Sequence, residues 1–274
     1  MTRVRLGAVS YLNARPCVVG LDRHPRFDLR FDLPSRCSAL LHAGETDIGL
    51  IPSIEYLRGP NGPGGYRIVP GVAIGSTGPV ASVALYTTRP IADVRSIALD
   101  TSSRTSVALT RVMCARAFHI DPVLEPHGPD LAGMLERCDA ALLIGDAALL
   151  VDHTQVRLKA DATYEPVEKI DLGEVWTKTT GLPFVYAFWA GVPAALTGDD
   201  VRAIQAARDA GVADPERVAR DYFDDPSLHA IGAHYLRDNI KYDLGDAEQA
   251  GLETFYRYAA ELDLVPEPSG LRFY

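Results

Sequence analysis

The segment "VRLGAVSYLNARP" (residues 4–16) places polar side chains directly after a short apolar run. Its first six residues have the composition of a strand, and Ser10 and Asn13 follow at once. Pro16 is typical of the first turn of a helix, so the strand is expected to end where a helical segment begins. The segment therefore predicts a strand, a polar strand end and a helical turn.

The same order of features returns about ninety residues later in the chain. Residues 95–118, "RSIALDTSSRTSVALTRVMCARAF", repeat the strand, the polar cluster and the helix of residues 4–16. A second pair has the order helix, acidic turn, apolar strand, polar residues and helix, in "ALLHAGETDIGLIPSIEYL" (39–57) and "GMLERCDAALLIGDAALL" (133–150). The two pairs predict two similar α/β lobes.

Alternating strands and helices favour parallel sheets, which bind ligands beyond the carboxyl ends of their strands. Four polar clusters fall at such ends. They are Ser10 to Asn13, Pro52 with Ser53, Thr101 to Ser106, and Gly145 with Asp146. The two lobes are therefore expected to face each other across one cleft.

Two extended runs flanked by Gly and Pro, residues 75–91 and 179–193, are predicted to be strands that cross between the lobes. The first lobe is then discontinuous and is completed by three C-terminal helices. These are predicted over residues 199–212, 214–223 and 246–265, each opening with an aspartate. Lobe I is assigned to residues 1–84 and 187–274, and lobe II to residues 85–186.

Composition excludes several classes of protein. A formal net charge of −9 and a pI near 5.2 disfavour binding to nucleic acid. No run of about 18 apolar residues predicts a membrane helix, and the N-terminus lacks a signal-peptide core. Four cysteines stand far apart, with no metal-binding spacing, and are expected to be reduced, buried thiols in a cytoplasmic protein. The oligomeric state is not determined by these features.

The best local anion site is "TSSRTSV" (101–107), at the start of a predicted helix. Unpaired N–H groups of a first helical turn attract anions, and the hydroxyls of Ser102, Ser103, Thr105 and Ser106 add donors. The plainer alternative is that one serine caps the helix and the others are solvated. The Arg104 guanidinium would either hold a carboxylate or point to solvent.

The other strand ends have both a binding and a plainer interpretation. Gly145 allows a backbone to approach a ligand closely, and Asp146 would cap the helix that follows it. Ser53 would likewise act as a cap, with Glu55 in the first turn and solvated or paired with the helix dipole. Motifs for a nucleophilic serine, a metal site or a nucleoside triphosphate are not found. The residues alone predict a cleft for a small carboxylate and leave enzyme and binder open.

A set of segments resembles one enzyme family, the chorismate dehydratases of the futalosine route to menaquinone. In chain order they are "VSYLNARP" (9–16), "DIGLIPSIEYL" (47–57), "GPVASVALY" (78–86), "SSRTSVAL" (102–109), "LIGDAAL" (143–149) and "DLGEVWTKTTGLPFVYAFWA" (171–190). The resemblance ends near residue 190 and does not cover the C-terminal helices. It implies an α/β, two-lobe type II periplasmic-binding-protein fold with a central cleft and two crossing strands.

The resemblance also implies a reaction, the cofactor-free elimination of water from chorismate to give 3-(1-carboxyvinyloxy)benzoate. The enolpyruvyl carboxylate of the substrate is expected to take the ring proton, so the enzyme would be a lyase without a strong base of its own. Matched motif by motif, Asn13 and Ser82 are the expected catalytic residues. The expected substrate-binding residues are Ser10, Ser53, Ser102, Ser103, Arg104, Thr105, Ser106, Gly145 and Asp146.

Two other functions stay open at this point. The same fold serves non-catalytic proteins that bind small carboxylates, and fold alone does not fix function. The related 1,4-dihydroxy-6-naphthoate synthases resemble this family but have a different opening motif and a catalytic histidine. No histidine occurs in the four strand-end clusters, which favours the dehydratase.

Overall fold

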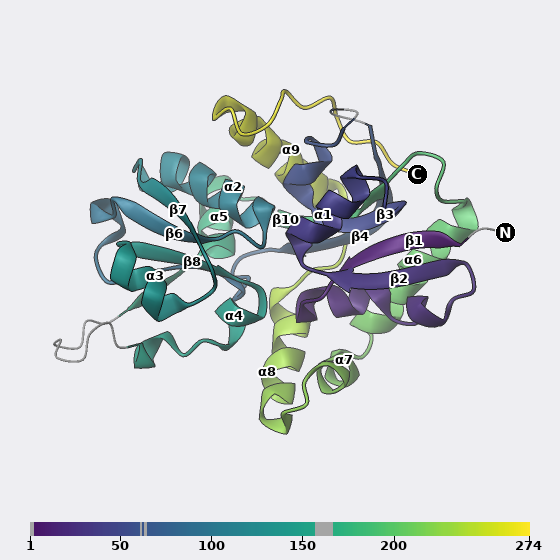
Figure 1. Ribbon diagram of the computed structural model, residues 1–274, viewed down its shortest axis with the longest axis horizontal. Coiled ribbons are helices and arrows are strands. Elements are labelled where there is room, and N and C mark those ends of the chain that lie inside the picture. The colour runs from purple at the N-terminus through teal and green to yellow at the C-terminus, as the bar shows by residue number, and fades with distance from the viewer. Residues whose placement is uncertain (1–2, 61, 63–64, 157–166) are drawn as a thin grey trace.

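The computed structural model describes residues 3–60, 62, 65–156 and 167–274, which form two lobes built around two five-stranded sheets (Figure 1). The first sheet has the strand order β2-β1-β3-β10-β4, and the second has the order β7-β6-β8-β5-β9. The strands are β1 (Val4–Val9), β2 (Phe27–Asp32), β3 (Ile48–Pro52), β4 (Arg67–Ser76), β5 (Val83–Thr87), β6 (Ser96–Asp100), β7 (Val123–His127), β8 (Ala140–Ile144), β9 (Glu168–Asp171) and β10 (Phe184–Gly191).

The two sheets share one pattern of pairing. In the first sheet β1 pairs in parallel with β2 and β3, and in the second β6 pairs in parallel with β7 and β8. Each sheet then takes one antiparallel strand between two others: β10 lies between β3 and β4, and β5 lies between β8 and β9. This confirms the two similar α/β lobes predicted from the repeated segments.

The chain passes between the lobes twice. Residues 77–82 lead from β4 in the first sheet to β5 in the second, and helix α5 (Leu172–Thr180) leads from β9 back to β10. The antiparallel strands are thus the ones that follow the crossings. The assigned lobe borders, after residues 84 and 186, lie within β5 and β10 and stay predictions.

Helices cover the sheets and include the three predicted at the C-terminus. The helices of the described residues are α1 (Pro34–His42), α2 (Arg104–Met113), α3 (Leu131–Arg137), α4 (Gly145–Leu150), α5, α6 (Gly198–Val212), α7 (Pro215–Tyr222), α8 (His229–His234) and α9 (Asp246–Glu261), with the short helical turns η1 (Leu12–Val18), η3 (Ser53–Tyr56) and η8 (Tyr235–Asn239) among others. Asp214 caps α7, as expected. Sequence reasoning missed α8 and η8, which continue directly into one another.

Residues from the C-terminal part of the chain hold the turn that carries Asn13. Helix α6 packs on η1, and Gly211 makes this possible, because a Cβ atom there would lie 2.3 Å from the Pro16 carbonyl oxygen. The Tyr242 hydroxyl also donates a hydrogen bond to the Asn13 carbonyl oxygen, at 3.0 Å. The backbone at Asn13 is therefore fixed by contacts more than two hundred residues away in sequence.

Candidate functional site

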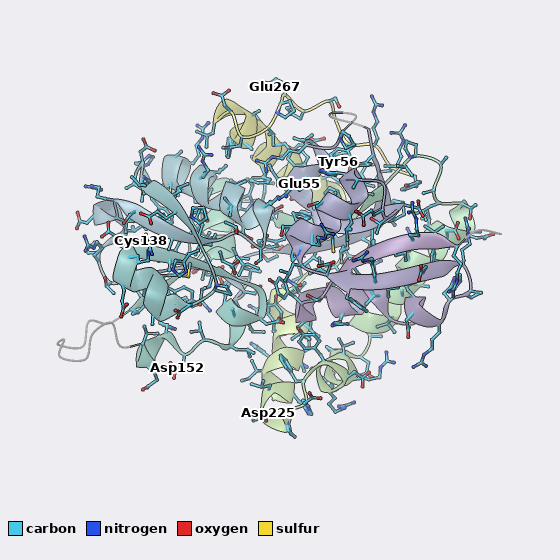
Figure 2. The ribbon with its side chains drawn as sticks, viewed as in Figure 1. Glu55, Tyr56, Cys138, Asp152, Asp225 and Glu267 are labelled. Carbon is cyan, nitrogen blue, oxygen red and sulfur yellow. The ribbon has the colours of Figure 1, made fainter. Side chains whose placement is uncertain are left out.

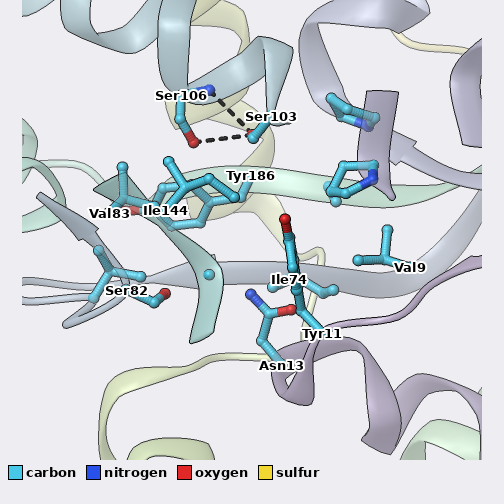
Figure 3. Close-up of a pocket in the computed structure, with 15 residues that line it drawn as sticks. Val9, Tyr11, Asn13, Ile74, Ser82, Val83, Ser103, Ser106, Ile144 and Tyr186 are labelled. Atoms are coloured by element: carbon cyan, nitrogen blue, oxygen red, sulfur yellow. Dashed lines mark hydrogen bonds between the residues drawn. The ribbon is translucent and has the colours of Figure 1, made fainter. Parts of the chain in front are cut away.

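A cavity lies between the lobes at the carboxyl ends of the parallel strands. The lining residues surround about 480 Å³ of space not filled by protein atoms, part of which is open solvent. Its lining residues come from both lobes and are Val9, Tyr11, Asn13, Pro34, Pro52, Ile74, Val80, Ser82, Val83, Ser103, Ser106, Ile144, Gly145, Tyr186 and Ala187 (Figure 3). Not one of these lining residues has an acidic, basic, imidazole or thiol side chain. A carboxylate in the cavity would therefore be held by neutral donors.

One wall of the cavity is the N-terminus of α2. Ser103 is the N-cap, and its Oγ accepts a hydrogen bond from the Ser106 N–H at 3.4 Å and lies 3.0 Å from the Ser106 Oγ (Figure 3). One serine caps the helix, as in the plainer alternative, but the other hydroxyls are not simply solvated, because Thr105 and Ser106 are buried. Because both hydroxyls also line the cavity, they and the N-terminus of α2 form a donor-rich wall.

The opposite wall brings together Asn13 and Ser82, which come from different segments of the chain (Figure 3). Both side chains interact with the hydroxyl of Tyr235, which is fully buried in η8 and donates to the Ser82 Oγ at 2.6 Å. Burial raises the pKa of this phenol, while its hydrogen bonds with Ser82 and Asn13 lower it in part. Tyr235 therefore stays protonated at neutral pH and acts as a donor.

Several residues expected to bind substrate instead join the lobes. Thr105 is buried, and its Oγ1 accepts a hydrogen bond from the Ile54 N–H at 3.2 Å. Arg104 donates to the carboxylate of Glu55 at 2.6 Å, stays partly exposed and does not belong to the cavity lining. Ser53 was expected to cap η3. It does not, because its hydroxyl donates to the Val185 carbonyl oxygen at 2.8 Å.

Glu55 is neither solvated nor paired with a helix dipole. Its side chain is 1% exposed, lies close to the border of the lobes and is paired with Arg58 as well as Arg104 (Figure 2). A buried carboxylate needs such partners to remain charged. The prediction failed because the sequence gives no sign that an arginine about fifty residues away would reach this turn.

Asp146 was also expected to act as a cap, but its side chain does not cap α4. It accepts hydrogen bonds from the Leu12 N–H at 3.2 Å and from the Tyr222 hydroxyl, both in the other lobe. Burial raises the pKa of this carboxyl, and the two hydrogen bonds lower it in part. The first turn of α4 faces the opposite lobe. The Asp146 carboxylate therefore joins the two lobes and does not cap its own helix.

Ser102 and Ser10 also lie outside the cavity lining. The Ser102 hydroxyl donates to Asp100 at 2.7 Å and accepts from the Tyr11 hydroxyl at 3.1 Å, again between lobes. The carbonyl oxygen of Ser10 accepts from Arg15 at 3.0 Å. Of the eleven expected site residues, the cavity lining thus contains Asn13, Ser82, Ser103, Ser106 and Gly145.

Two tyrosines that sequence reasoning missed line the cavity. Tyr11 packs against Gly145, where a Cβ atom would lie only 3.0 Å from its ring. Tyr186, in β10, lies with its hydroxyl 3.2 Å from the Ser76 Oγ. Tyr11 stands inside the opening polar motif, so its position gave a usable signal. Tyr186 stands in an apolar run typical of a buried strand, so the sequence gave no sign that it would line the cavity.

The described residues contain no cluster of His, Cys, Asp and Glu side chains suited to a metal ion. In the same part of the chain, no helix combines the length and apolar character needed to cross a membrane. All four cysteines are buried and free, as predicted.

Solved structures identify the class of fold. An Archaeoglobus fulgidus protein matches with a TM-score of 0.71 at 15% identity, covering 96% of this chain and 98% of that one. The alkanesulfonate-binding protein SsuA from Xanthomonas axonopodis pv. citri matches with a TM-score of 0.68 at 15% identity, covering 97% and 95% of the two chains. The periplasmic aliphatic sulphonate binding protein from Escherichia coli gives 0.67 at 16%, covering 97% and 94%. The protein therefore has the type II periplasmic-binding-protein fold.

Sequence comparison identifies the family within that class. Residues 4–261 match the family model described as menaquinone biosynthesis, so the chain belongs to this menaquinone biosynthesis family. It is also 29% identical over 264 residues to a chorismate dehydratase from Thermus thermophilus, a match that covers 88% of this chain and 94% of the relative.

Proposed function

We propose that the protein dehydrates chorismate to 3-(1-carboxyvinyloxy)benzoate in menaquinone biosynthesis. The observation that carries the proposal is that Asn13 and Ser82 lie on one wall of a cavity with a neutral lining, opposite the serine-lined start of α2. The identity to a chorismate dehydratase supports the same reaction.

The chemistry needs no strong base from the protein. The ring carboxylate is conjugated with C3 through a double bond, so donors that bind this carboxylate stabilise the charge that develops when the C3–H bond breaks. The electron pair forms the C3–C4 double bond, hydroxide leaves C4 and gains a proton, and the ring becomes aromatic. The enolpyruvyl carboxylate takes the C3 proton, in agreement with the neutral lining of the cavity.

Ser82 and Asn13 are assigned to the reacting groups. Ser82 donates to the departing C4 hydroxyl, and the Asn13 amide orients the enolpyruvyl group. Ser103, Ser106 and the first-turn N–H groups of α2 then hold a carboxylate on the other wall.

The test is to incubate purified protein with chorismate and no added cofactor, and to follow loss of the diene absorbance with the product identified by mass spectrometry. Turnover to the carboxyvinyloxybenzoate is the expected result. Binding of chorismate without turnover would favour a solute-binding protein. Conversion of a later bicyclic intermediate, with no reaction of chorismate, would instead favour a naphthoate synthase.

A further inference from the structure

Ser82 follows a turn with a strained backbone. Ala81 has a φ of 64°, in the left-handed region that residues with a Cβ atom rarely adopt. Such a conformation persists only where the surrounding structure holds it, and it is found mostly at functional sites. The turn also lies where the chain crosses between lobes, so it sets the direction in which the Ser82 side chain leaves the backbone.

Two side chains of strand β9 hold this turn. The Asp171 carboxylate accepts hydrogen bonds from the N–H groups of Val80 at 3.0 Å and Ala81 at 2.7 Å, and it also caps α5. The Lys169 ammonium donates to the Ala81 carbonyl oxygen at 2.9 Å. Because the carboxylate and the ammonium bind the backbone on both sides of Ala81, they fix its left-handed conformation.

The side chain of Ser82 is held separately, by Tyr235. A serine hydroxyl has one proton to donate and two lone pairs to accept with. The Tyr235 hydroxyl donates to one of those lone pairs at 2.6 Å. The Ser82 proton cannot point toward that donor, so it is directed elsewhere, and Ser82 lines the cavity.

We propose that Tyr235 and Asp171 are positioning residues that hold Ser82 as a hydrogen-bond donor to the substrate. Tyr235 acts on the hydroxyl, and Asp171 acts on the turn that precedes it. The inference rests on the proposed function, since a departing hydroxide needs a donor at C4. Neither residue lines the cavity, so each acts through Ser82 and not by touching substrate.

The first test is Tyr235→Phe, which removes one hydroxyl and keeps the ring. We expect kcat for chorismate to fall about tenfold with KM changed less than about twofold, because a contact to the reacting group is misdirected while binding is kept. In a Ser82→Ala background the same change is expected to have a much smaller effect on kcat, because only the contact with Asn13 is then lost. Tyr256→Phe is the matched control, because Tyr256 is also fully buried and donates to one carbonyl oxygen, that of Ser53, outside the cavity lining.

The second test is Asp171→Asn, which keeps one oxygen to cap α5 but places an NH₂ group against an N–H donor. We expect a fall in kcat of about tenfold, again absent when Ser82 is already alanine. Asp214→Asn is the control, because Asp214 caps α7 far from the turn. If one variant does not fold, the other decides the proposal.

Wild-type turnover of chorismate is measured first, so that two failures can be told apart. Absence of wild-type turnover would overturn the proposed function and this inference with it. Wild-type turnover together with an unchanged kcat in a folded Tyr235→Phe or Asp171→Asn variant would overturn the inference alone. A loss that persists undiminished in the Ser82→Ala background would also overturn it, because the residue would then not act through Ser82.

Discussion

Asn13 and Ser82 have neutral side chains, and the proposed function assigns the reacting groups of the substrate to them. Both belong to a cavity lining made of neutral residues, where a positioned hydrogen bond to a developing charge stabilises the transition state. Asn13→Ala and Ser82→Ala are each expected to lower kcat about tenfold or more. Steady-state assays with chorismate check this.

Measuring the stability of these variants separates a catalytic effect from unfolding. Ser82→Ala leaves the buried Tyr235 hydroxyl without an acceptor and is expected to cost about 1–2 kcal/mol in urea unfolding. The variant should therefore remain folded in the assay. Wild-type kcat in both variants would show that other residues carry the reaction.

Gly145 is required by its backbone and by its neighbour. Its φ is 62°, and a Cβ atom would lie 3.0 Å from the Tyr11 ring. Gly145→Ala is expected to destabilise the protein by about 2–3 kcal/mol, of which about 1 kcal/mol is backbone strain. Gly181→Ala is the matched control, because Gly181 has a φ of 73° with nothing within 4 Å of its Cβ position, so it should cost the strain alone. Equal losses in urea unfolding would contradict the contact with Tyr11.

At the scale of elements, the start of α2 and the turn η3 join the lobes through the ion pair of Arg104 and Glu55. Arg104 is 42% exposed, and the buried Glu55 keeps Arg58 as a cationic partner when Arg104 is removed, so the loss is expected to be at most about 1 kcal/mol, or about a fivefold change in an equilibrium. Arg104→Ala is therefore expected to change kcat/KM by less than about fivefold.

If Arg104 instead binds a substrate carboxylate, its loss should lower kcat/KM much more. Loss of a guanidinium that holds a substrate carboxylate costs about 2–5 kcal/mol, so a fall in kcat/KM of about a hundredfold would contradict the role assigned to the pair. Arg58→Ala is the control, because Arg58 binds the same carboxylate of Glu55. Both variants are compared by steady-state kinetics.

At the scale of the whole molecule, the described residues of the two lobes that line the cavity include no histidine, cysteine or charged side chain. Burial raises the pKa of the lining tyrosines Tyr11 and Tyr186 above the ordinary value of a phenol, so both keep their protons throughout the neutral range. We therefore expect kcat to be constant from about pH 6 to about pH 9.

The pH profile needs a check on folding, which circular dichroism over the same range provides. An inflection of kcat near pH 7, with the fold intact, would indicate a general base in the protein. That result would contradict proton transfer to the substrate's own carboxylate.

The repeated segments predicted both lobes because strand and helix patterns are local, and the polar clusters predicted the cleft because parallel strands end at one edge. The resemblance supplied Asn13 and Ser82 as candidates. Sequence reasoning missed α8 and η8, and with them Tyr235, because a tyrosine in a short C-terminal helix carries no sign of its partner. It also misread Asp146 as a local cap, although its acceptor role is toward the other lobe.

The sequence by itself determined the two-lobe α/β architecture and the polar strand ends, since both follow from patterns within about twenty residues of chain. Only the tertiary structure decided which polar groups reach the cavity and which join the lobes. The physical reason is that a hydroxyl or carboxylate binds whichever partner folding brings within about 3 Å, and here those partners come from the opposite lobe.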